Sequence, residues 1–329
     1  LSGGVDGQGK VSYFFFFIFF FLLSVLYSPF ASTVPFFFSF FFFSFLVSFF
    51  QMLSTSTYKV QGTMVGHKGG VNCVAFAPGS SCPVTAGMDA TIKVWASGVK
   101  KSIKCTSTLT GHTGGIDSLS LHPSLPLCLT SSASDGTWRT WDYDVGQDLM
   151  RCDGSSSSGT TGVQHAVLHP DGLLVAGGAD KVNGKSHGIV FWDLRQDSSQ
   201  KTTVLGYSDS GSMTCMSFSP NGYNAVSGDA EGGVHVWDLR KAGTAGQAKV
   251  VSLRVGNGRC HSVRYDEAGK YLAACGAGVV DVYAHKKWSG PLVSLTSQKG
   301  DIRCVDFTKQ SASMVTGSMD RTIKFWSPQ

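Results

Sequence analysis

Residues 317–326 read GSMDRTIKFW, and this stretch is the clearest copy of a unit that recurs along the chain. Earlier copies are GMDATIKVW at 87–95, SDGTWRTWD at 134–142 and GDAEGGVHVWDLR at 228–240. Each copy contains small residues, an Asp, a few turn residues and an alternating stretch that leads to an aromatic residue. A self-similarity of fixed length determines the architecture of a chain, so the fold follows from this repeat.

The aromatic residues that close the copies define the period. They lie 46, 51, 45, 46 and 43 residues apart, at Trp95, Trp141, Trp192, Trp237, Tyr283 and Trp326. A period of about 40 to 45 residues with Gly-His and Trp-Asp dipeptides is typical of a propeller blade of four strands. Gly66-His67 and Gly111-His112 open the two most complete copies. The sequence therefore predicts an all-β, WD40-type β-propeller of seven blades, of which the first is incomplete or interrupted.

Residues 11–51 cause that interruption. Residues 1–10 resemble the middle of a blade, with Asp6 at the turn position, and residues 58–65 are predicted to be the outer strand that completes it. The third strand that should follow Asp6 does not arrive, because the intervening tract is mostly Phe and Ser and contains 18 of the 23 phenylalanines. As protein, this tract is apolar enough to suggest a membrane segment.

The tract fits a membrane segment poorly. Its apolar runs at 13–27 and 36–50 are each 15 residues long, and two prolines lie between them. A helix needs about 20 apolar residues to span a bilayer. A secretory signal would need a basic start and a cleavage site, and would not follow half a blade.

A translated intron is the interpretation that we favour for residues 11–51. Residues 10–12 can be encoded AAG-GTG-AGT, which contains a donor splice site, and residues 49–51 can be encoded TTT-TTT-CAG, which ends in an acceptor site. The tract is a whole number of codons, so its removal keeps the reading frame. We thus expect a blade remnant at 1–10, an intron-derived tract at 11–51 and the propeller at 52–329, with a membrane segment as the alternative.

Composition argues against several classes of site. The net charge of +5 is spread over loops and does not by itself indicate nucleic-acid binding. The nine cysteines form no CxxC pair and are an odd number, which argues against a zinc site and a secreted disulfide framework. Cys73, Cys215 and Cys304 fall at one position of the repeat, which serines and a histidine occupy elsewhere. We interpret them as reduced packing residues, as in a cytosolic or nuclear protein.

Each blade of this type can hold a buried chain of hydrogen bonds from a His, through a Ser or Thr and an Asp, to a Trp. The second blade offers His67, Thr85, Asp89 and Trp95, and the third offers His112, Ser131 or Ser132, Asp135 and Trp141. Further Asp and Trp pairs are Asp180 with Trp192, Asp229 with Trp237, and Asp320 with Trp326. Burial of such groups is tolerable only where they satisfy one another. Because the set recurs whereas an active site would occur once, we predict a structural role, and no catalytic, metal or cofactor site.

Two segments are candidates for partner binding. Residues 184–186 read GKS, but the spacing of the preceding glycines is wrong for a phosphate loop and no helix is predicted to follow. The surrounding residues 181–188 instead predict an enlarged turn, with Lys181, Asn183, Lys185 and His187 as candidate contacts. Lys286, Lys287 and Trp288 combine charge with an aromatic ring, which could stack on an RNA base or pack at a blade edge.

Beyond the repeat, the chain resembles the C-terminal propeller of the pre-mRNA-processing factor 19 family, spliceosomal U-box ubiquitin ligases. The resemblance rests on LSGGVDG, LHPDGLLVAGG, FSPNGYNAVSGDAEGGVHVWDLRK, YDEAGKYLAACGAGVVDVYAHKKW and TGSMDRTIKFWS. Residues 218–288 are the strongest part of the resemblance. Their sixth blade lacks a turn Asp and ends in Val-Tyr followed by Lys-Lys-Trp, as in the family and unlike generic WD repeats. The resemblance covers 1–10 and 52–329, and the tract at 11–51 and the turn at 181–188 depart from it.

The resemblance implies a substrate- and partner-binding domain of a splicing factor. In the family, a U-box recruits a ubiquitin-conjugating enzyme and a coiled coil forms a tetramer, and neither motif is found in this sequence. The implied setting is a nuclear, spliceosome-associated complex with roles in mRNA splicing, ubiquitin conjugation and DNA repair, and ligase activity would belong to a full-length parent protein. The alternative is a WD-repeat scaffold of another signalling or chromatin complex, since propellers host many functions.

Overall fold

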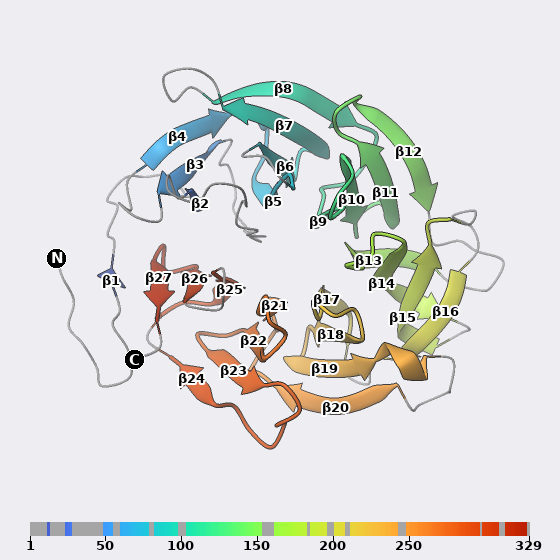
Figure 1. The fold of residues 1–329 in the computed structure, drawn as a ribbon, viewed down its shortest axis with the longest axis vertical. Coiled ribbons are helices and arrows are strands. Elements are labelled where there is room, and N and C mark those ends of the chain that lie inside the picture. Colours follow the sequence, from blue (N-terminus) through green and yellow to red (C-terminus); the bar gives the residue numbers. More distant parts are fainter. Residues whose placement is uncertain are drawn as a thin grey trace. The chain divides into compact units, whose positions relative to one another are not determined.

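The computed structural model describes 13 stretches of backbone: 12–13, 24–27, 49–54, 60–78, 82–97, 103–152, 161–182, 185–195, 201–207, 211–242, 248–296, 298–308 and 313–327. The protein is all-β and of the β-propeller class, as predicted (Figure 1). Helical structure in these stretches is confined to one 3-10 turn, η2 (Leu239–Lys241). The strands form six four-stranded sheets and one three-stranded sheet, which belongs to the first blade.

The chain divides into two compact units, and the division falls within the fourth blade. One unit comprises Phe20–Asn183 and Trp192–Lys201, and the other comprises Leu1–Phe19, Gly184–Phe191 and Thr202–Gln329. The fourth blade is built in chain order from β13 (Thr161–Leu168), β14 (Leu174–Val182), β15 (Lys185–Asp193) and β16 (Lys201–Tyr207).

The first unit contains the first three blades. They are formed by β2 (Ser24–Tyr27), β3 (Phe49–Ser54) and β4 (Val60–Val65); by β5 (Val71–Phe76), β6 (Pro83–Gly87), β7 (Thr91–Ser97) and β8 (Ile103–Thr110); and by β9 (Ser118–Leu121), β10 (Leu127–Ser132), β11 (Thr137–Asp142) and β12 (Gln147–Cys152). Neighbouring strands of the second and third blades are antiparallel.

The other unit contains the last three blades. They are formed by β17 (Met213–Phe218), β18 (Asn224–Asp229), β19 (Gly233–Asp238) and β20 (Lys249–Arg254); by β21 (Ser262–Tyr265), β22 (Tyr271–Cys275), β23 (Val280–Ala284) and β24 (Val293–Leu295); and by β25 (Ile302–Phe307), β26 (Met314–Ser318), β27 (Ile323–Trp326) and β1 (Ser12–Tyr13). The last sheet thus takes its fourth strand from the opposite end of the chain, where Ser12 pairs with Phe325.

Burial falls from the first strand of a blade to the last. Every residue of β5 and β6 is buried, whereas most residues of the outer strands β8 and β12 are exposed. Neighbouring blades contact each other through their first strands, β5 with β9 and β21 with β25 (Figure 1). The core therefore lies between adjacent blades, where apolar residues on first and second strands meet.

One position of the first strand packs between blades in the way the repeat predicts. Its occupants in the second to seventh blades are all buried: Cys73, Ser118, His165, Cys215, Ser262 and Cys304. The Cys73 thiol donates to the Asp117 carbonyl oxygen at 3.3 Å, and the Ser118 hydroxyl donates to that of Ala166 at 2.8 Å. These two hydrogen bonds link the first strands of the second and third blades to the blade that follows each. All nine cysteines are free thiols.

In the second, third and fifth blades, the third strand has a β-bulge at its closing Trp. The register shifts between Val94 and Trp95, between Thr140 and Trp141, and between Val236 and Trp237. A bulge bends its strand and changes the direction of a side chain. The recurring bulge therefore gives the indoles of these three blades a common local backbone geometry.

The first blade differs from the prediction. A third strand does form, because β3 pairs antiparallel with β4, the predicted outer strand, and β2 pairs parallel with β3. Residues of the tract at 11–51 also supply β1, β2 and half of β3. Phe and β-branched residues favour extended backbone, which accounts for strand formation in so apolar a tract. Residues 1–10 lie outside the described stretches.

The predicted turn at 181–188 is also corrected by the structure. β14 extends to Val182 and β15 begins at Lys185, so most of the expected turn is strand, and Asp180 lies within β14 rather than at a turn. The dipeptide Asn183-Gly184 is typical of a short hairpin connection, so this signal could have predicted the two strands from the sequence. Among the described residues, no helix has the length and apolar character needed to cross a membrane.

Candidate functional site

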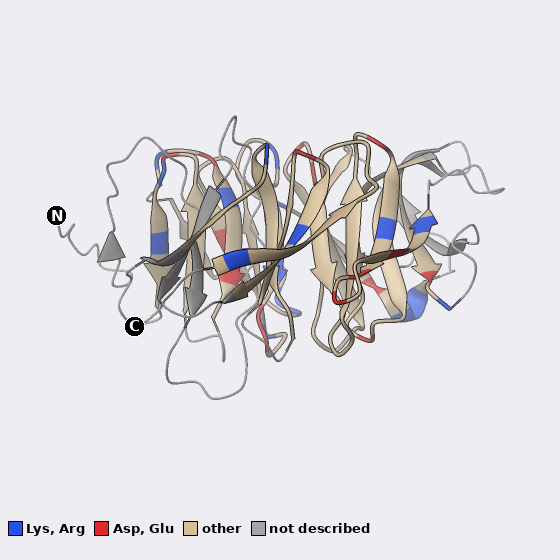
Figure 2. Ribbon diagram, turned by 90° about the horizontal axis from the view of Figure 1, so that it is seen from above, with Lys and Arg blue, Asp and Glu red and all other residues tan. Residues whose placement is uncertain are grey.

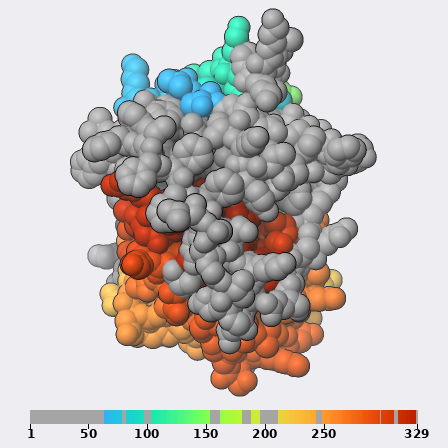
Figure 3. Space-filling model, turned by 90° about the vertical axis from the view of Figure 1, so that its left-hand side faces the viewer, coloured from blue at the N-terminus to red at the C-terminus, as the bar shows by residue number. Residues whose placement is uncertain are grey.

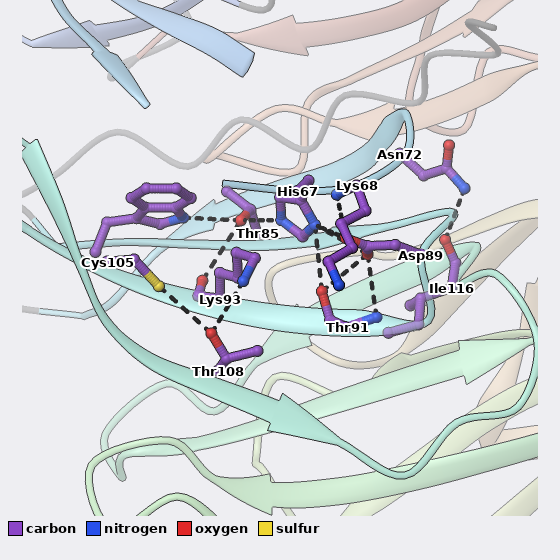
Figure 4. A network of polar contacts seen from close by, with 11 residues as sticks. His67, Lys68, Asn72, Thr85, Asp89, Thr91, Lys93, Cys105, Thr108 and Ile116 are labelled. Carbon is purple, nitrogen blue, oxygen red and sulfur yellow. Dashed lines mark hydrogen bonds and ion pairs between the residues drawn. The ribbon is translucent and has the colours of Figure 1, made fainter. Parts of the chain in front are cut away.

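The second blade contains a buried polar network that joins the segment before β5 to β6, β7 and the turn between them (Figure 4). The Trp95 indole N–H donates to Thr85 Oγ1 at 2.8 Å, and Thr85 Oγ1 lies 2.8 Å from His67 Nε2. His67 Nδ1 lies 3.0 Å from Asp89 Oδ1. His67, Thr85 and Trp95 are almost fully buried, so each polar atom depends on its neighbour in this chain.

The direction of these hydrogen bonds follows from the chemistry of the end groups. The Asp89 carboxylate can only accept, so His67 Nδ1 carries the proton that it donates. His67 Nε2 is then an acceptor and takes the Thr85 hydroxyl proton, while Thr85 Oγ1 accepts from Trp95. Every donor is used in one direction, from the indole to the carboxylate. The carboxylate also accepts from Lys68 N–H at 2.8 Å and the Thr91 hydroxyl at 2.8 Å.

Asp89 remains ionised in this site. Burial by itself would raise its pKa, but hydrogen bonds from the His67 side chain, the Lys68 N–H and the Thr91 side chain outweigh burial and hold the pKa well below its usual range. The network therefore contains a permanent carboxylate. The donors to this carboxylate are His67 and Lys68, before β5, and Thr91, at the start of β7, so the carboxylate links these two segments.

The third blade repeats the network with one correction. Trp141 Nε1 donates to Thr130 Oγ1 at 2.8 Å, Thr130 Oγ1 lies 2.9 Å from His112 Nε2, and His112 Nδ1 lies 2.8 Å from Asp135. The hydroxyl is thus that of Thr130, not of Ser131 or Ser132 as predicted. Ser131 instead accepts from the Ala166 N–H of the next blade at 3.0 Å.

The pKa values of this pair agree with a neutral imidazole and an ionised carboxylate. Burial lowers the pKa of His112 in spite of the neighbouring Asp135. Burial would raise the pKa of Asp135, but hydrogen bonds from His112 and Thr137 lower it below its ordinary value. At neutral pH the proton therefore stays on one His112 nitrogen and the set is a fixed hydrogen-bond chain.

The seventh blade has the same network with glutamine in place of histidine. Trp326 Nε1 donates to Thr316 Oγ1 at 2.9 Å, and the Thr316 hydroxyl donates to Gln298 Oε1 at 2.8 Å. Gln298 Nε2 donates to Thr322 Oγ1 at 3.0 Å, which donates to Asp320 Oδ1 at 2.6 Å. The amide oxygen accepts as an imidazole nitrogen would and the amide N–H donates, so the direction of the chain is preserved.

The fifth blade splits the network in two. Trp237 Nε1 donates to Ser227 Oγ at 2.9 Å, whereas Asp229 pairs at 3.0 Å with Nε2 of His235 on the third strand. The other imidazole nitrogen lies 2.9 Å from Ser252 Oγ. Asp229 and Trp237 were predicted from the sequence, whereas His235 was not, because no Gly-His dipeptide marks it.

The structure leaves the predicted pair of the fourth blade untested, and the sixth blade departs further from the set. Trp192 is buried and lies edge-on to Trp138, with ring centroids 5.9 Å apart, while the Asp180 side chain lies outside the described residues. In the sixth blade, Tyr283 replaces the Trp and its hydroxyl donates to the Arg254 carbonyl oxygen at 3.4 Å. The absence of a turn Asp in the sixth blade, expected from the sequence, matches this different arrangement.

The first candidate docking segment cannot be described at the level of side chains. Lys181 lies in β14, and Lys185 and His187 lie in β15, but their side chains are outside the described part of the structure. Asn183 lies outside it altogether. Their role in partner binding stays a prediction.

The second candidate segment presents two lysines and a packed tryptophan. Lys286 and Lys287 are exposed, and Lys286 adopts a positive φ of 66°. Trp288 is half-buried against a cluster that includes Val263 and Leu272, and its ring meets that of His285 edge-on at 5.6 Å. Much of the ring is thus used for packing, which leaves the two lysines as the accessible groups.

Comparison with known families decides the identity of the repeat. The model of the WD domain, G-beta repeat, matches residues 58–96, 103–142, 199–238 and 289–327. The chain contains WD40 repeats. The four matched WD40 segments close the second, third, fifth and seventh blades. In each of these four blades an indole N–H donates to a Ser or Thr hydroxyl, and an Asp accepts hydrogen bonds.

Relatives extend the likeness beyond the WD40 repeat. Over 268 residues the chain is 30% identical to pre-mRNA-processing factor 19 of Oryza sativa subsp. japonica, which covers 80% of the chain and 48% of the relative. It is 29% identical to pre-mRNA-processing factor 19 homolog 2 of Arabidopsis thaliana over 274 residues, and 30% identical to the Mus musculus factor over 274 residues. The chain is thus homologous to pre-mRNA-processing factor 19 across about 80% of its length, and it spans about half the length of the curated relatives it matches.

The buried hydrogen-bond networks of the second and third blades are structural rather than catalytic, for two physical reasons. A His, a hydroxyl and an Asp recur with the same geometry in the second and third blades, and each Thr hydroxyl is held between an indole and an imidazole. A nucleophile needs access to substrate, whereas Thr85 and Thr130 are fully buried. Within the described ranges no cluster of three or more His, Cys, Asp or Glu side chains is arranged to hold a metal ion.

Proposed function

We propose that this chain is the substrate- and partner-binding WD40 domain of a pre-mRNA-splicing factor whose full-length form has E3 ubiquitin ligase activity. The observation that carries the proposal is the homology to pre-mRNA-processing factor 19 across 80% of the chain. Ligase activity would reside in a U-box of the parent protein, with tetramer formation through a coiled coil. The domain itself would bind proteins of a spliceosome-associated complex and the substrates of the ligase, in the nucleus.

The distribution of polar groups supports a binding role. The hydrogen-bond sets fix the loops before the first strands to the turns between second and third strands, as Lys68 N–H and Asp89 illustrate at 2.8 Å. Loops that are held in this way form a preorganised surface, which lowers the entropic cost of binding a partner. We place the docking surface on these loops and turns, with Lys286 and Lys287 as a further contact.

RNA contact receives less support than protein contact. Trp288 packs against the blade, so its ring is only partly available for stacking on a base. Lys and Arg are interspersed with Asp and Glu among the coloured residues of Figure 2 rather than gathered into one stripe. A nucleic-acid site usually needs such a stripe of basic residues.

Affinity purification of the tagged chain from nuclear extract tests the proposal. We expect mass spectrometry to recover spliceosomal proteins with the wild-type chain. The same chain unfolded by heat before mixing is the control and should lose them, because docking requires folded loops. Recovery of only a different signalling or chromatin assembly would contradict the proposal and favour a WD-repeat scaffold of another complex.

Ligase activity needs a separate experiment. The transcript upstream of the first codon should be sequenced for a U-box and a coiled coil, and the full-length protein assayed for ubiquitin transfer. We expect activity from the full-length protein and none from this chain alone. A full-length protein that lacks a U-box would remove the ligase part of the proposal and leave the splicing part untouched.

We also propose that residues 11–51 derive from a translated intron, in keeping with the splice-site codons at both ends. Sequencing of reverse-transcribed message across the codons for Lys10 and Met52 tests this. Skipping of residues 11–51 is the expected result. A mature message that retains those codons would contradict it, and the membrane-associated alternative would then be tested by fractionation.

A further inference from the structure

Two buried cysteines meet between the fifth and sixth blades, which are yellow to orange in Figure 3. Cys215 lies on β17, and Cys260 lies two residues before the start of β21. Their Sγ atoms are 3.8 Å apart, and the exposed fractions of the two residues are 3% and 0%. Strands β17 and β21 belong to one compact unit and contact each other, so the two thiols lie inside the interface between these blades.

Cys260 occupies a repeat position that larger apolar residues fill in the other blades. The position lies two residues before the one that Cys215 occupies in its own blade, and its other occupants in the second to seventh blades are all buried: Val71, Ile116, Val163, Met213 and Ile302. The Cys260 N–H donates to the Asp229 carbonyl oxygen at the end of β18, at 3.1 Å. The Ile116 N–H makes the equivalent bond to the Gly87 carbonyl oxygen at the end of β6, at 3.0 Å. Cysteine buries less apolar surface at this position than isoleucine does, so what it adds is a thiol.

Cys73 occupies the same position of the first strand as Cys215 and provides the comparison within the chain. The Cys73 thiol donates to the Asp117 carbonyl oxygen of the next blade at 3.3 Å. In the fifth blade the sulfur of Cys215 instead faces the sulfur of Cys260. The surroundings are closely packed, because a Cβ on Gly228 would lie 2.6 Å from Cys215 Sγ and 2.7 Å from Cys260 Sγ. The two thiols are therefore held in contact by the packing of both blades.

The hydrogen bonds around the pair distinguish its two thiols. Burial would raise the pKa of Cys215, but hydrogen bonds from Cys260 and from the Thr214 hydroxyl hold that pKa below its usual value. The hydrogen bond to Cys215 and burial raise the pKa of Cys260 well above its usual value. Cys215 is therefore the thiol that loses its proton more readily, and the thiolate is the form of cysteine that reacts with oxidants.

We propose that hydrogen peroxide converts Cys215 and Cys260 into a disulfide that links the fifth and sixth blades. In the first step the Cys215 thiolate attacks one peroxide oxygen, an S–O bond forms and the O–O bond breaks. The hydroxide that leaves takes up the proton that Cys215 lost and becomes water. In the second step the Cys260 sulfur attacks the sulfenic sulfur of Cys215, an S–S bond forms and the S–O bond breaks. The second hydroxide leaves with the Cys260 proton as water, so two thiols are oxidised and one peroxide is reduced.

The contact between the sulfurs favours the disulfide over further oxidation. The two Sγ atoms have to approach from 3.8 Å to the bond length of about 2.0 Å. A sulfenic acid condenses with a thiol beside it, whereas one without such a neighbour is open to oxidation to the sulfinic acid. A small thiol such as glutathione would restore both cysteines by thiol–disulfide exchange.

Peroxide reaches the pair through the loop at 255–261, which leads from β20 to β21. Cys260 follows directly after Arg259, which is exposed, and Asn257 is exposed as well. Local opening of a surface loop exposes the residues at its base without separating the sheets. Once formed, the disulfide would hold this loop against β17 and restrict the unfolded chain, which stabilises the folded state.

The test is peptide mapping of the folded full chain after treatment with hydrogen peroxide. Remaining thiols are alkylated, and the chain is digested with trypsin without reduction. Cys215 is the one cysteine of the tryptic peptide 202–240, and Cys260 is the one cysteine of the peptide 260–264. We expect mass spectrometry to find these peptides joined, with a mass two hydrogens below their sum, and dithiothreitol to separate them. The oxidised chain should also unfold at a urea concentration about 1 M higher than the reduced chain.

The repeat itself supplies variants that fit the fold. Cys260→Val introduces the residue that Val71 and Val163 provide at this position, and it should abolish both the joined peptides and the shift in urea unfolding. Cys73→Ser is the matched control, because serine occupies that position in the third and sixth blades, and it should leave the yield of joined peptides unchanged.

The wild-type chain decides the proposal even if a variant does not fold. A free thiol or a sulfinic acid at Cys215 after peroxide treatment of the folded chain, in place of the link to Cys260, would overturn the proposal. A link that forms only in chain unfolded by urea would overturn it too, because native contact is then not its cause. No splicing component enters this assay, so its failure is distinct from a failure of the function proposed above.

Discussion

Replacement of Thr85 by valine removes the middle of the hydrogen-bond chain in the second blade and keeps the shape of the side chain. Thr85 is fully buried, accepts from Trp95 Nε1 at 2.8 Å and donates to His67 Nε2 at 2.8 Å. The valine leaves an indole N–H and an imidazole nitrogen buried without that partner. Each such loss costs about 1 to 3 kcal/mol, so we expect about 2 to 4 kcal/mol after the gain from the added methyl group.

Urea unfolding followed by tryptophan fluorescence measures this cost. At a slope of about 3 kcal/mol per M, Thr85→Val should lower the unfolding midpoint by about 1 M. Thr106→Val is the control, because the Thr106 hydroxyl is exposed and donates to the Val94 carbonyl oxygen at 3.1 Å in the same blade. We expect the control to stay within about 0.5 kcal/mol of the wild type.

A double-variant cycle separates the hydrogen bonds from other effects of the substitution. Trp95→Phe removes the indole donor, so the combined variant should cost less than the sum of the two single variants. Thr85→Val with a stability equal to that of Thr106→Val would refute the view that the network stabilises the blade. Strict additivity of Thr85→Val and Trp95→Phe would refute the assigned bond between them.

Three further predictions concern other blades and pH. Ala90→Gly should stabilise the protein by about 0.5 to 1 kcal/mol, because Ala90 has a φ of 59° where the third blade has Gly136 at 69°; a lower thermal midpoint would contradict this. Gln298→Leu should lower the free energy of unfolding by about 2 to 3 kcal/mol in urea, because it leaves the Thr316 hydroxyl without its acceptor. Gln298→His keeps the order of donor and acceptor and should lower it by less than about 1 kcal/mol, and equal losses for the two variants would contradict this prediction. The pKa of His261 is lowered to about 4, so the unfolded chain binds more protons than the folded chain between pH 4 and about 6.5. The free energy of unfolding should therefore fall by up to ~3 kcal/mol as the pH drops through that window. His261→Gln should make the free energy of unfolding less dependent on pH, and an unchanged pH profile would show that His261 is not the source of the dependence.

The spacing of the aromatic residues was sufficient to predict the fold class and most of the buried sets. Trp95, Trp141, Trp237 and Trp326 each donate to a hydroxyl on the second strand of the same blade. This succeeded because the indole, the hydroxyl and the Asp lie within one hairpin, where local sequence separation reflects distance in space. The first blade was predicted less well, because apolar residues of any origin can supply a strand.

The hydroxyl of the third blade was missed because its hairpin is one residue longer. Thr85, Ser227 and Thr316 lie ten residues before their tryptophans, and counting ten before Trp141 gives Ser131. The property that is preserved is the register, because the hydroxyl residue pairs with the residue two before the Trp. Thr85 pairs with Lys93, and Thr130 pairs with Arg139.

Gln298 was missed because the search relied on residue identity rather than on polarity. It lies four residues before Ile302, as His67 lies before Val71 and His112 before Ile116. The physical requirement at this position is an acceptor on one side and a donor on the other, which a glutamine meets. A search for that pair of properties would have found it.

The pairing of β1 with β27 has a consequence for the order of folding. Ser12 and Phe325 lie side by side although they are roughly 310 residues apart in the chain, so this contact has the high sequence separation that slows folding. During synthesis the strand with Ser12 emerges first and has no partner until β27 is complete. The last sheet therefore reaches four strands only after β27 has left the ribosome, and translation that stops before Trp326 leaves the sheet unfinished.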